Sequence, residues 1–193
     1  MKRCDFFKAI GGLAGLGLFS GWAKSELVVS DIIVFGLGGF GSRMISRLSC
    51  DMTPLFESDH PVPTFVALDT NQNLAFESVE KTTDSSLVIL MAGMGGSTGT
   101  NLMPQLAEQI RRSGALTVSV VTVPENDIMS AQKLSQLENA SDVVFVRKLA
   151  VPSAVSNIEL CVTERARSLL DAEKWMLQCT GGLLQAVAKR WRH

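Results

Sequence analysis

The chain has 193 residues, a net charge of -1 and 46% hydrophobic residues, which is sufficient for one ordinary domain with a sizeable core. The balanced charge has no basic excess, so we expect no nucleic-acid-binding surface. Its two histidines and four scattered cysteines form neither a zinc-binding spacing nor a His-based catalytic triad. We therefore expect no metal site built from protein ligands.

The first 25 residues have the order of a signal peptide. Basic residues come first, an apolar run follows at 9–19, and small residues follow at 20–23. The start, MKRCDFFKAIGG, resembles a twin-arginine export signal in which Cys4 stands where the second arginine belongs. The apolar run is too short and too rich in glycine for a membrane span, so we expect membrane contact only through residues 1–25.

From residue 26 onward, strands and helices are predicted to alternate. Apolar, β-branched runs predict strands at 27–35, 64–68, 87–91, 116–123 and 143–146. Helical spacing predicts helices behind a glycine turn at 36–41, at 102–110, at 127–138 and near 158–178, with a last helix after Gly181-Gly182. This alternation predicts an α/β fold: a Rossmann-like parallel sheet flanked by helices in a three-layer sandwich.

The first glycine-rich turn, Gly36-Leu37-Gly38-Gly39-Phe40-Gly41, fits the pattern GxGxxG between a strand and a helix. Glycines there let the backbone approach a pyrophosphate, and the helix N-terminus supplies free amides. Asp69, at the end of the second strand, is placed to accept a ribose hydroxyl. By themselves these features predict an NAD-binding Rossmann oxidoreductase, although the shortage of histidine and the absence of tyrosine leave few acid–base candidates.

A second loop, Gly95-Gly96-Ser97-Thr98-Gly99-Thr100, follows the third strand. Its composition offers consecutive backbone N–H groups in a concave nest, together with three hydroxyls, at the start of a helix. A dinucleotide-binding domain does not need this second loop. The loop therefore predicts a receptor for a phosphate chain.

The stretch GGSTGTN at 95–101 resembles the GGGTGTG signature of the FtsZ/tubulin GTPase family. The flanking LVILMAGM and QLAEQIRRSGALTVSVVTVP resemble the strand, helix and next strand of that family. IIVFGLGGFGSRMISRL resembles its first nucleotide loop and helix, and FVALDTNQ its second strand and loop. The resemblance extends over residues 30–125.

The resemblance implies a nucleotide-binding domain at 26–157 and C-terminal helices at 158–193, similar to the family's central helix. Guanine nucleotide, GTP or GDP, would be the ligand, with Mg²⁺ held through phosphate oxygens and water. The residues implied to bind it are Gly38, Gly39 and Gly41, the Asp69-Thr70-Asn71 loop beside the phosphates and metal, and Gly95, Gly96, Ser97, Thr98, Gly99 and Thr100 around the α- and β-phosphates.

Several positions depart from the family pattern. Ile128 and Gln132 stand where the family places a glutamate and an arginine on the ribose, and Lys148-Leu149-Ala150 where it places the asparagine that reads guanine. Base specificity is therefore left open. After the central helix the family carries an acidic loop that stimulates hydrolysis in a neighbouring subunit, whereas this sequence continues GGLLQAVAKRWRH, so the second FtsZ domain and the loop are expected to be absent.

The resulting hypothesis is a cytoplasmic FtsZ-like pseudo-GTPase of bacterial cell division, with weak or no self-stimulated hydrolysis. Its expected partner is a full-length FtsZ-like protein, whose filament it would modulate, or a second copy of itself. Export or membrane tethering through the N-terminal segment is the alternative location. The NAD-dependent oxidoreductase and a non-binding interaction module or truncated FtsZ-like product remain as alternative functions.

Overall fold

The computed structural model describes residues 30–52, 62–68, 86–149 and 158–191. The predicted signal-like segment and the Asp69-Thr70-Asn71 loop lie outside these residues. Within the described ranges, no helix combines the length and the apolar content that a membrane crossing needs.

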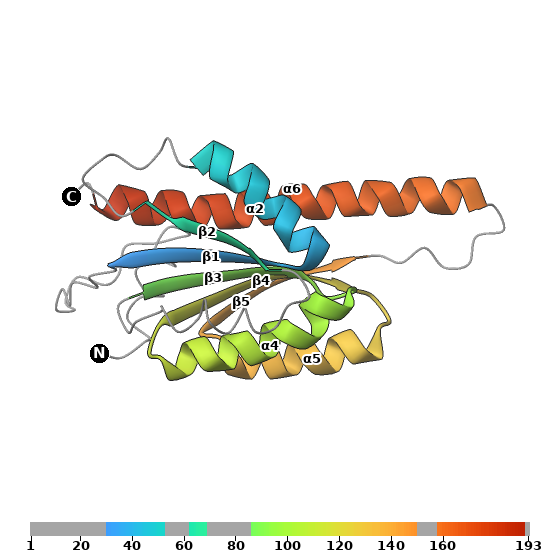
Figure 1. Cartoon of the computed structure of the whole chain (residues 1–193). Coiled ribbons are helices and arrows are strands. Elements are labelled where there is room, and N and C mark those ends of the chain that lie inside the picture. Colours follow the sequence, from blue (N-terminus) through green and yellow to red (C-terminus); the bar gives the residue numbers. More distant parts are fainter. Residues whose placement is uncertain (1–29, 53–61, 69–85, 150–157, 192–193) are drawn as a thin grey trace, which may run out of the picture.

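The described part forms a five-stranded sheet in the order β2-β1-β3-β4-β5, and every neighbouring pair of strands is parallel. The strands are β1 (Asp31–Leu37), β2 (Thr64–Leu68), β3 (Ser86–Gly93), β4 (Leu116–Pro124) and β5 (Val143–Leu149). The helices are α2 (Gly38–Met52), α4 (Ser97–Arg112), α5 (Ile128–Ala140) and α6 (Ile158–Trp191). Helices α2 and α6 cover one face of the sheet and α4 and α5 the other, which confirms the predicted α/β sandwich (Figure 1).

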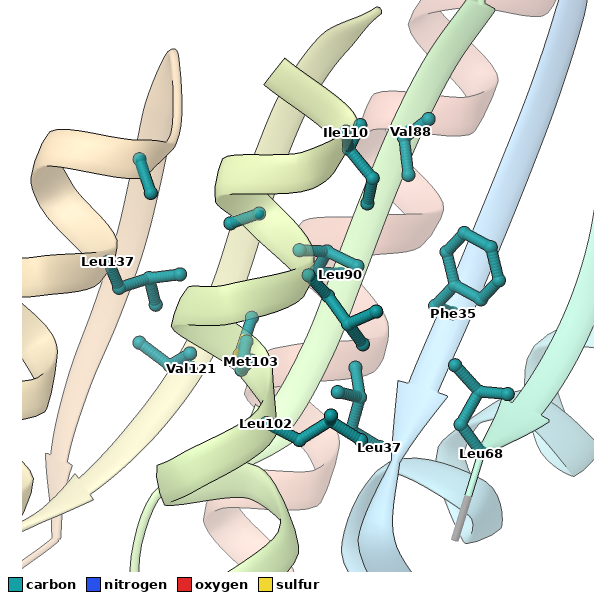
Figure 2. Packing of buried hydrophobic residues seen from close by; sticks show 14 of the residues in the cluster. Phe35, Leu37, Leu68, Val88, Leu90, Leu102, Met103, Ile110, Val121 and Leu137 are labelled. Atoms are coloured by element: carbon teal, nitrogen blue, oxygen red, sulfur yellow. The ribbon is translucent and has the colours of Figure 1, made fainter. Parts of the chain in front are cut away.

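The core has one apolar layer on each side of the sheet. Along β3, Val88 and Leu90 face the cluster under α4, whereas Ile89 and Met91 face the cluster under α6. Figure 2 shows the first cluster, with side chains of α4 pointing toward β1 and β3. Because both faces of a parallel sheet are covered, its central strand is apolar throughout instead of alternating with polar residues. Burying each such side chain contributes about 1.5–3 kcal/mol.

Two helices differ from the prediction. Helix α4 begins at Ser97, inside the glycine-rich loop, whereas the apolar spacing predicted its start at residue 102. Helix α6 continues through Gly181-Gly182, where the sequence predicted a break between two helices. Leu184 and Val187 extend the buried row of α6 beyond these glycines. Their burial outweighs a helix-propensity cost of about 1 kcal/mol for each glycine.

Candidate functional site

The two glycine-rich turns meet at the carboxyl edge of the sheet. β1 lies between β2 and β3, and the connections from β1 and β3 enter helices on opposite faces, α2 and α4. Open α/β sheets bind their ligands at such a switch point. Gly38 has φ +67°, which favours glycine, and a Cβ built there would lie 3.3 Å from Cβ of Thr98. The turns are thus in contact.

The turn between β3 and α4 is held in place by hydrogen bonds around Met94. Its backbone N–H donates to the carbonyl oxygen of Thr122 at 2.8 Å. Its carbonyl oxygen accepts hydrogen bonds from the hydroxyls of Thr100 and of Ser130, the latter on α5. The turn is therefore fixed by β4 and α5 before any ligand arrives.

Helix α4 begins without a capping side chain. Its N-cap residue, Gly96, is extended, with φ −105° and ψ 154°. The first turn closes through a bond of 3.0 Å from the backbone N–H of Thr100 to the carbonyl oxygen of Gly96. The N–H groups of Ser97, Thr98 and Gly99 precede this bond and have no acceptor within the helix. Neither α4 nor α2 has an acidic residue in its first turn, so both termini retain their partial positive charge.

Both helix N-termini open into one cleft of about 480 Å³. A volume of this size suits a small-molecule ligand. Its lining combines the glycines and hydroxyls of the two turns with apolar side chains, among them Pro124, Leu149 and Leu169. The remaining lining residues are Leu37, Gly38, Gly39, Phe40, Gly93, Gly95, Gly96, Ser97, Thr98, Gly99, Thr122 and Ser168. The cleft therefore offers both polar groups and apolar surface to a ligand.

The structure divides the predicted site residues into two groups. Gly38, Gly39 and the stretch from Gly95 to Gly99 line the cleft. Gly41 and Thr100 are buried beside it and do not line it. A Cβ at Gly41 would lie 2.5 Å from the carbonyl oxygen of Met91, so this glycine lets α2 pack closely on the sheet. The hydroxyl of Thr100 already has its partner within the turn.

Sequence reasoning missed eight of the lining residues, of which Leu37 and Gly93 are the last residues of β1 and β3. Thr122, Pro124 and Leu149 stand at the carboxyl ends of β4 and β5, where a parallel sheet places its ligand-binding edge, so their strand positions were a usable signal. Phe40 stands within the first turn itself. Ser168 and Leu169 come from α6, and only the tertiary structure shows that this helix reaches the cleft. Ile128 and Gln132, at the positions compared with the family's ribose contacts, are exposed on α5 and do not line the cleft.

An ion-pair cluster links α6 to the helix that begins at the cleft. Glu173 is 8% exposed, and its carboxylate accepts hydrogen bonds from Arg43 at 3.3 and 3.4 Å and from Arg47 at 3.2 Å. The guanidinium of Arg43 also lies 5.7 Å from the ring centroid of Phe40. These contacts fix α6 against α2, and with it the wall formed by Ser168 and Leu169.

This combination of a switch-point cleft and a GGSTGT turn has a counterpart among known proteins. Residues 66–148 match the Tubulin/FtsZ family, GTPase domain. The cell division protein FtsZ of Helicobacter pylori is 30% identical over 151 residues, covering 60% of this chain and 39% of the relative. FtsZ 1 of Pyrococcus horikoshii is 44% identical over 68 residues, covering 32% of this chain and 18% of the relative.

The fold is also similar to that of a solved Tubulin/FtsZ family structure. An FtsZ mutant from M. jannaschii superposes with a TM-score of 0.56 and 23% sequence identity, covering 81% of this chain and 56% of that one. The sequence matches support the Tubulin/FtsZ family, and the superposition shows its nucleotide-binding-domain fold. The chain spans 39% of the length of its relative from Helicobacter pylori.

Proposed function

We propose that this chain is an FtsZ-like protein that binds a nucleotide, GTP or GDP, through its phosphates. The observation that carries the proposal is the convergence of two helix N-termini on one cleft, with Gly38 against Thr98. Unpaired N–H groups and two helix dipoles attract a polyanion to this point. Residues 26–157 form the proposed nucleotide-binding domain, and α6 adds Ser168 and Leu169 to the lining of its cleft.

The phosphate contacts we propose come from the two turns. The N–H groups of Ser97, Thr98 and Gly99 and the hydroxyls of Ser97 and Thr98 would surround the α- and β-phosphates. Gly38 and Gly39 would approach them from α2. Among the described lining residues none carries a carboxylate, so Mg²⁺ would be held by phosphate oxygens and water, as hard cations with few protein ligands are.

The sheet order favours this ligand over a dinucleotide. In the usual dinucleotide-binding order, the first strand lies between the second and the fourth. Here β1 lies between β2 and β3, and the GGSTGT turn occupies the switch point. The arrangement of the cleft therefore favours binding of the phosphate chain of a mononucleotide over binding of NAD.

We further propose that the 193-residue chain by itself hydrolyses GTP slowly or not at all. The described residues of the cleft offer amides and hydroxyls, and none is a carboxylate or imidazole that would act as a general base. Because its relatives are cell division proteins, the setting we propose is an FtsZ-type filament, formed with a longer FtsZ-like protein or with further copies of this chain. Single-turnover hydrolysis of GTP by the purified chain tests the first of these statements.

Nucleotide binding is tested by a charge placed in the first turn of α4. Ser97→Asp adds an acid at an exposed helix N-terminus, which stabilises a helix by about 0.3–1 kcal/mol, but it repels phosphate. We expect this variant to keep or raise the thermal stability of the ligand-free chain while GDP affinity falls at least tenfold. Ser97→Asn, of the same size and without charge, is the matched control and should retain binding.

Calorimetric titrations with GTP, GDP, ATP and NAD decide the proposal as a whole. Wild-type protein that binds none of them with a Kd below about 1 mM, equivalent to about -4 kcal/mol, would refute it. Equal affinity of Ser97→Asp and Ser97→Asn for GDP would refute the placement of the phosphates at α4.

A further inference from the structure

Strand β5 is an edge of the sheet, and no described strand lies on its outer side. In the order β2-β1-β3-β4-β5 it pairs with β4 alone. All seven residues of β5 pair one to one with β4, so no bulge interrupts the edge, and the strand contains neither proline nor glycine. An edge strand of this length presents a row of backbone N–H and C=O groups that can pair with a further strand.

The side chains of β5 are apolar at its start and basic near its end. The first four residues are apolar and half-buried, and Arg147 and Lys148 follow them. Val146 packs against the cluster under α4, and Phe145 against the cluster under α6. Because side chains alternate along a strand, Arg147 lies on the same face as Phe145. Its charge reaches the thiol of Cys179 on α6, where it opposes the larger rise in pKa that burial causes.

We propose that this edge is a dimer interface, in which β5 pairs antiparallel with β5 of a second copy about a two-fold axis at Val146. In this register all seven residues of each strand are paired. Arg147 of each copy then lies opposite Phe145 of the other, on the same face of the joined sheet. Neither Arg147 nor Lys148 has an ion-pair partner among the described residues, so the guanidinium is available to the aromatic ring.

The charges of β5 argue against the neighbouring registers. Directly opposed side chains share a face, so the axis of an antiparallel pair must pass through a residue. An axis at Arg147 would place two guanidiniums opposite each other, which destabilises a strand pair. An axis at Phe145 would leave Lys148 and Leu149 beyond the end of the partner strand. The strand is thus complementary to itself at Val146, which favours a second copy as its occupant.

This interface is separate from the cleft and does not depend on the proposed function. Leu149 is the one residue of β5 that lines the cleft. Because a single strand pair is a small interface, we expect a weak dimer. In sedimentation velocity with EDTA and without nucleotide, the dimer fraction should rise between about 1 μM and about 1 mM chain. A chain that stays monomeric throughout, or that grows beyond a dimer, overturns the proposal.

Two cysteine variants test the register, both in a chain whose exposed Cys50 is replaced by serine. Val146→Cys should form a disulfide between copies under mild oxidation, since opposed Cβ atoms lie about 4.5–5.5 Å apart. Val144→Cys packs on the same cluster and is the matched control. Its two copies would lie four residues apart along the strand pair, about 13 Å, which is too far for a disulfide. Peptide mapping without reduction that finds a link through residue 144, or none through residue 146, overturns the register.

Two charge reversals test the contact between Arg147 and Phe145. Arg147→Glu should weaken dimerisation at least about tenfold, because a carboxylate replaces the cation beside the ring. Lys148→Glu makes the same change of charge on the other face, opposite the apolar Val144, and should stay within about threefold of the wild type. Thermal unfolding at a concentration where the wild type is monomeric checks that both variants keep the fold. Equal weakening by the two reversals, or none by Arg147→Glu, overturns the contact.

Discussion

Two glycines of the same loop are expected to respond in opposite ways to alanine. A Cβ at Gly99 would lie 2.4 Å from the carbonyl oxygen of Gly93 and 3.2 Å from Cβ of Ala92. Both atoms belong to β3, so the start of α4 must move. A Cβ at Gly96 would come no closer than 4.0 Å to a neighbouring atom, and the backbone of Gly96 is in the extended region that alanine adopts freely.

The structure gives the sizes of the two effects. Overpacking of a rigid site costs about 1–3 kcal/mol, and alanine regains about 1 kcal/mol of helix propensity at residue 99. The contact at 2.4 Å is with backbone, so we expect Gly99→Ala to be destabilised by about 1–2 kcal/mol. At Gly96, alanine is a poorer N-cap residue, which lowers stability, but it also reduces the entropy of the unfolded chain, which raises stability. The net change in the free energy of unfolding should therefore stay within about 0.5 kcal/mol.

Thermal unfolding without nucleotide measures these differences. In a domain of this size 1 kcal/mol shifts Tm by about 2–4 °C, so Gly99→Ala should unfold roughly 2–8 °C below the wild type and Gly96→Ala within about 2 °C of it. Because the methyl group at residue 96 projects into open space at the cleft, Gly96→Ala should still weaken GDP binding. A Gly99→Ala protein as stable as the wild type, or a Gly96→Ala protein less stable than Gly99→Ala, would refute the packing described here.

Three further predictions concern charged and reactive side chains. Asp127 is the N-cap of α5, and the hydroxyl of Ser130 holds the pKa of its carboxyl below the usual range. The stability that this carboxylate contributes is therefore present above pH 3.8 and is lost as the pH falls through the pKa of the folded state. Asp127→Asn should therefore lower Tm at pH 7, and the gap to the wild type should narrow below pH 3.8; a gap independent of pH would contradict this. Glu173→Gln should lower stability by about 1–2 kcal/mol in chemical denaturation, because it weakens the hydrogen bonds to two arginines of α2, and no change would mean that α6 is held by apolar packing alone. Burial raises the pKa of the Cys179 thiol, whereas Cys50 is exposed, so peptide mapping should find iodoacetamide on Cys50 well before Cys179, and the reverse order would contradict the packing of α6.

The locally encoded features of the fold were predictable from the sequence. The strand at 64–68 was predicted with the bounds the structure gives it, because a short β-branched run between turn residues is a local pattern. Gly114, a typical helix stop signal after the basic pair Arg111-Arg112, has φ +91° shortly after the end of α4. The two glycine-rich turns were likewise recognisable, since their composition alone favours close approach of the backbone to an anion.

The roles of individual residues within those turns depended on tertiary contacts. Ser97 and Thr100 are equally plausible phosphate ligands in the sequence, yet only Ser97 faces the cleft. The hydroxyl of Thr100 bonds to Met94 because that carbonyl oxygen lies beneath the first turn of α4. Helical geometry turns neighbouring side chains to different sides, so the division follows from how α4 is set on the sheet.

The sequence by itself determined a parallel α/β sheet and two phosphate-type turns, because hydrophobic period and glycine content act over a few residues. Only the tertiary structure decided that Gly38 and Thr98 touch, that Thr122 forms the floor of the cleft and that α6 closes its wall. These contacts depend on the order β2-β1-β3-β4-β5 and on the faces that the helices cover. Strand order is set by long-range packing of both apolar layers, and this packing cannot be predicted from any single segment of the chain.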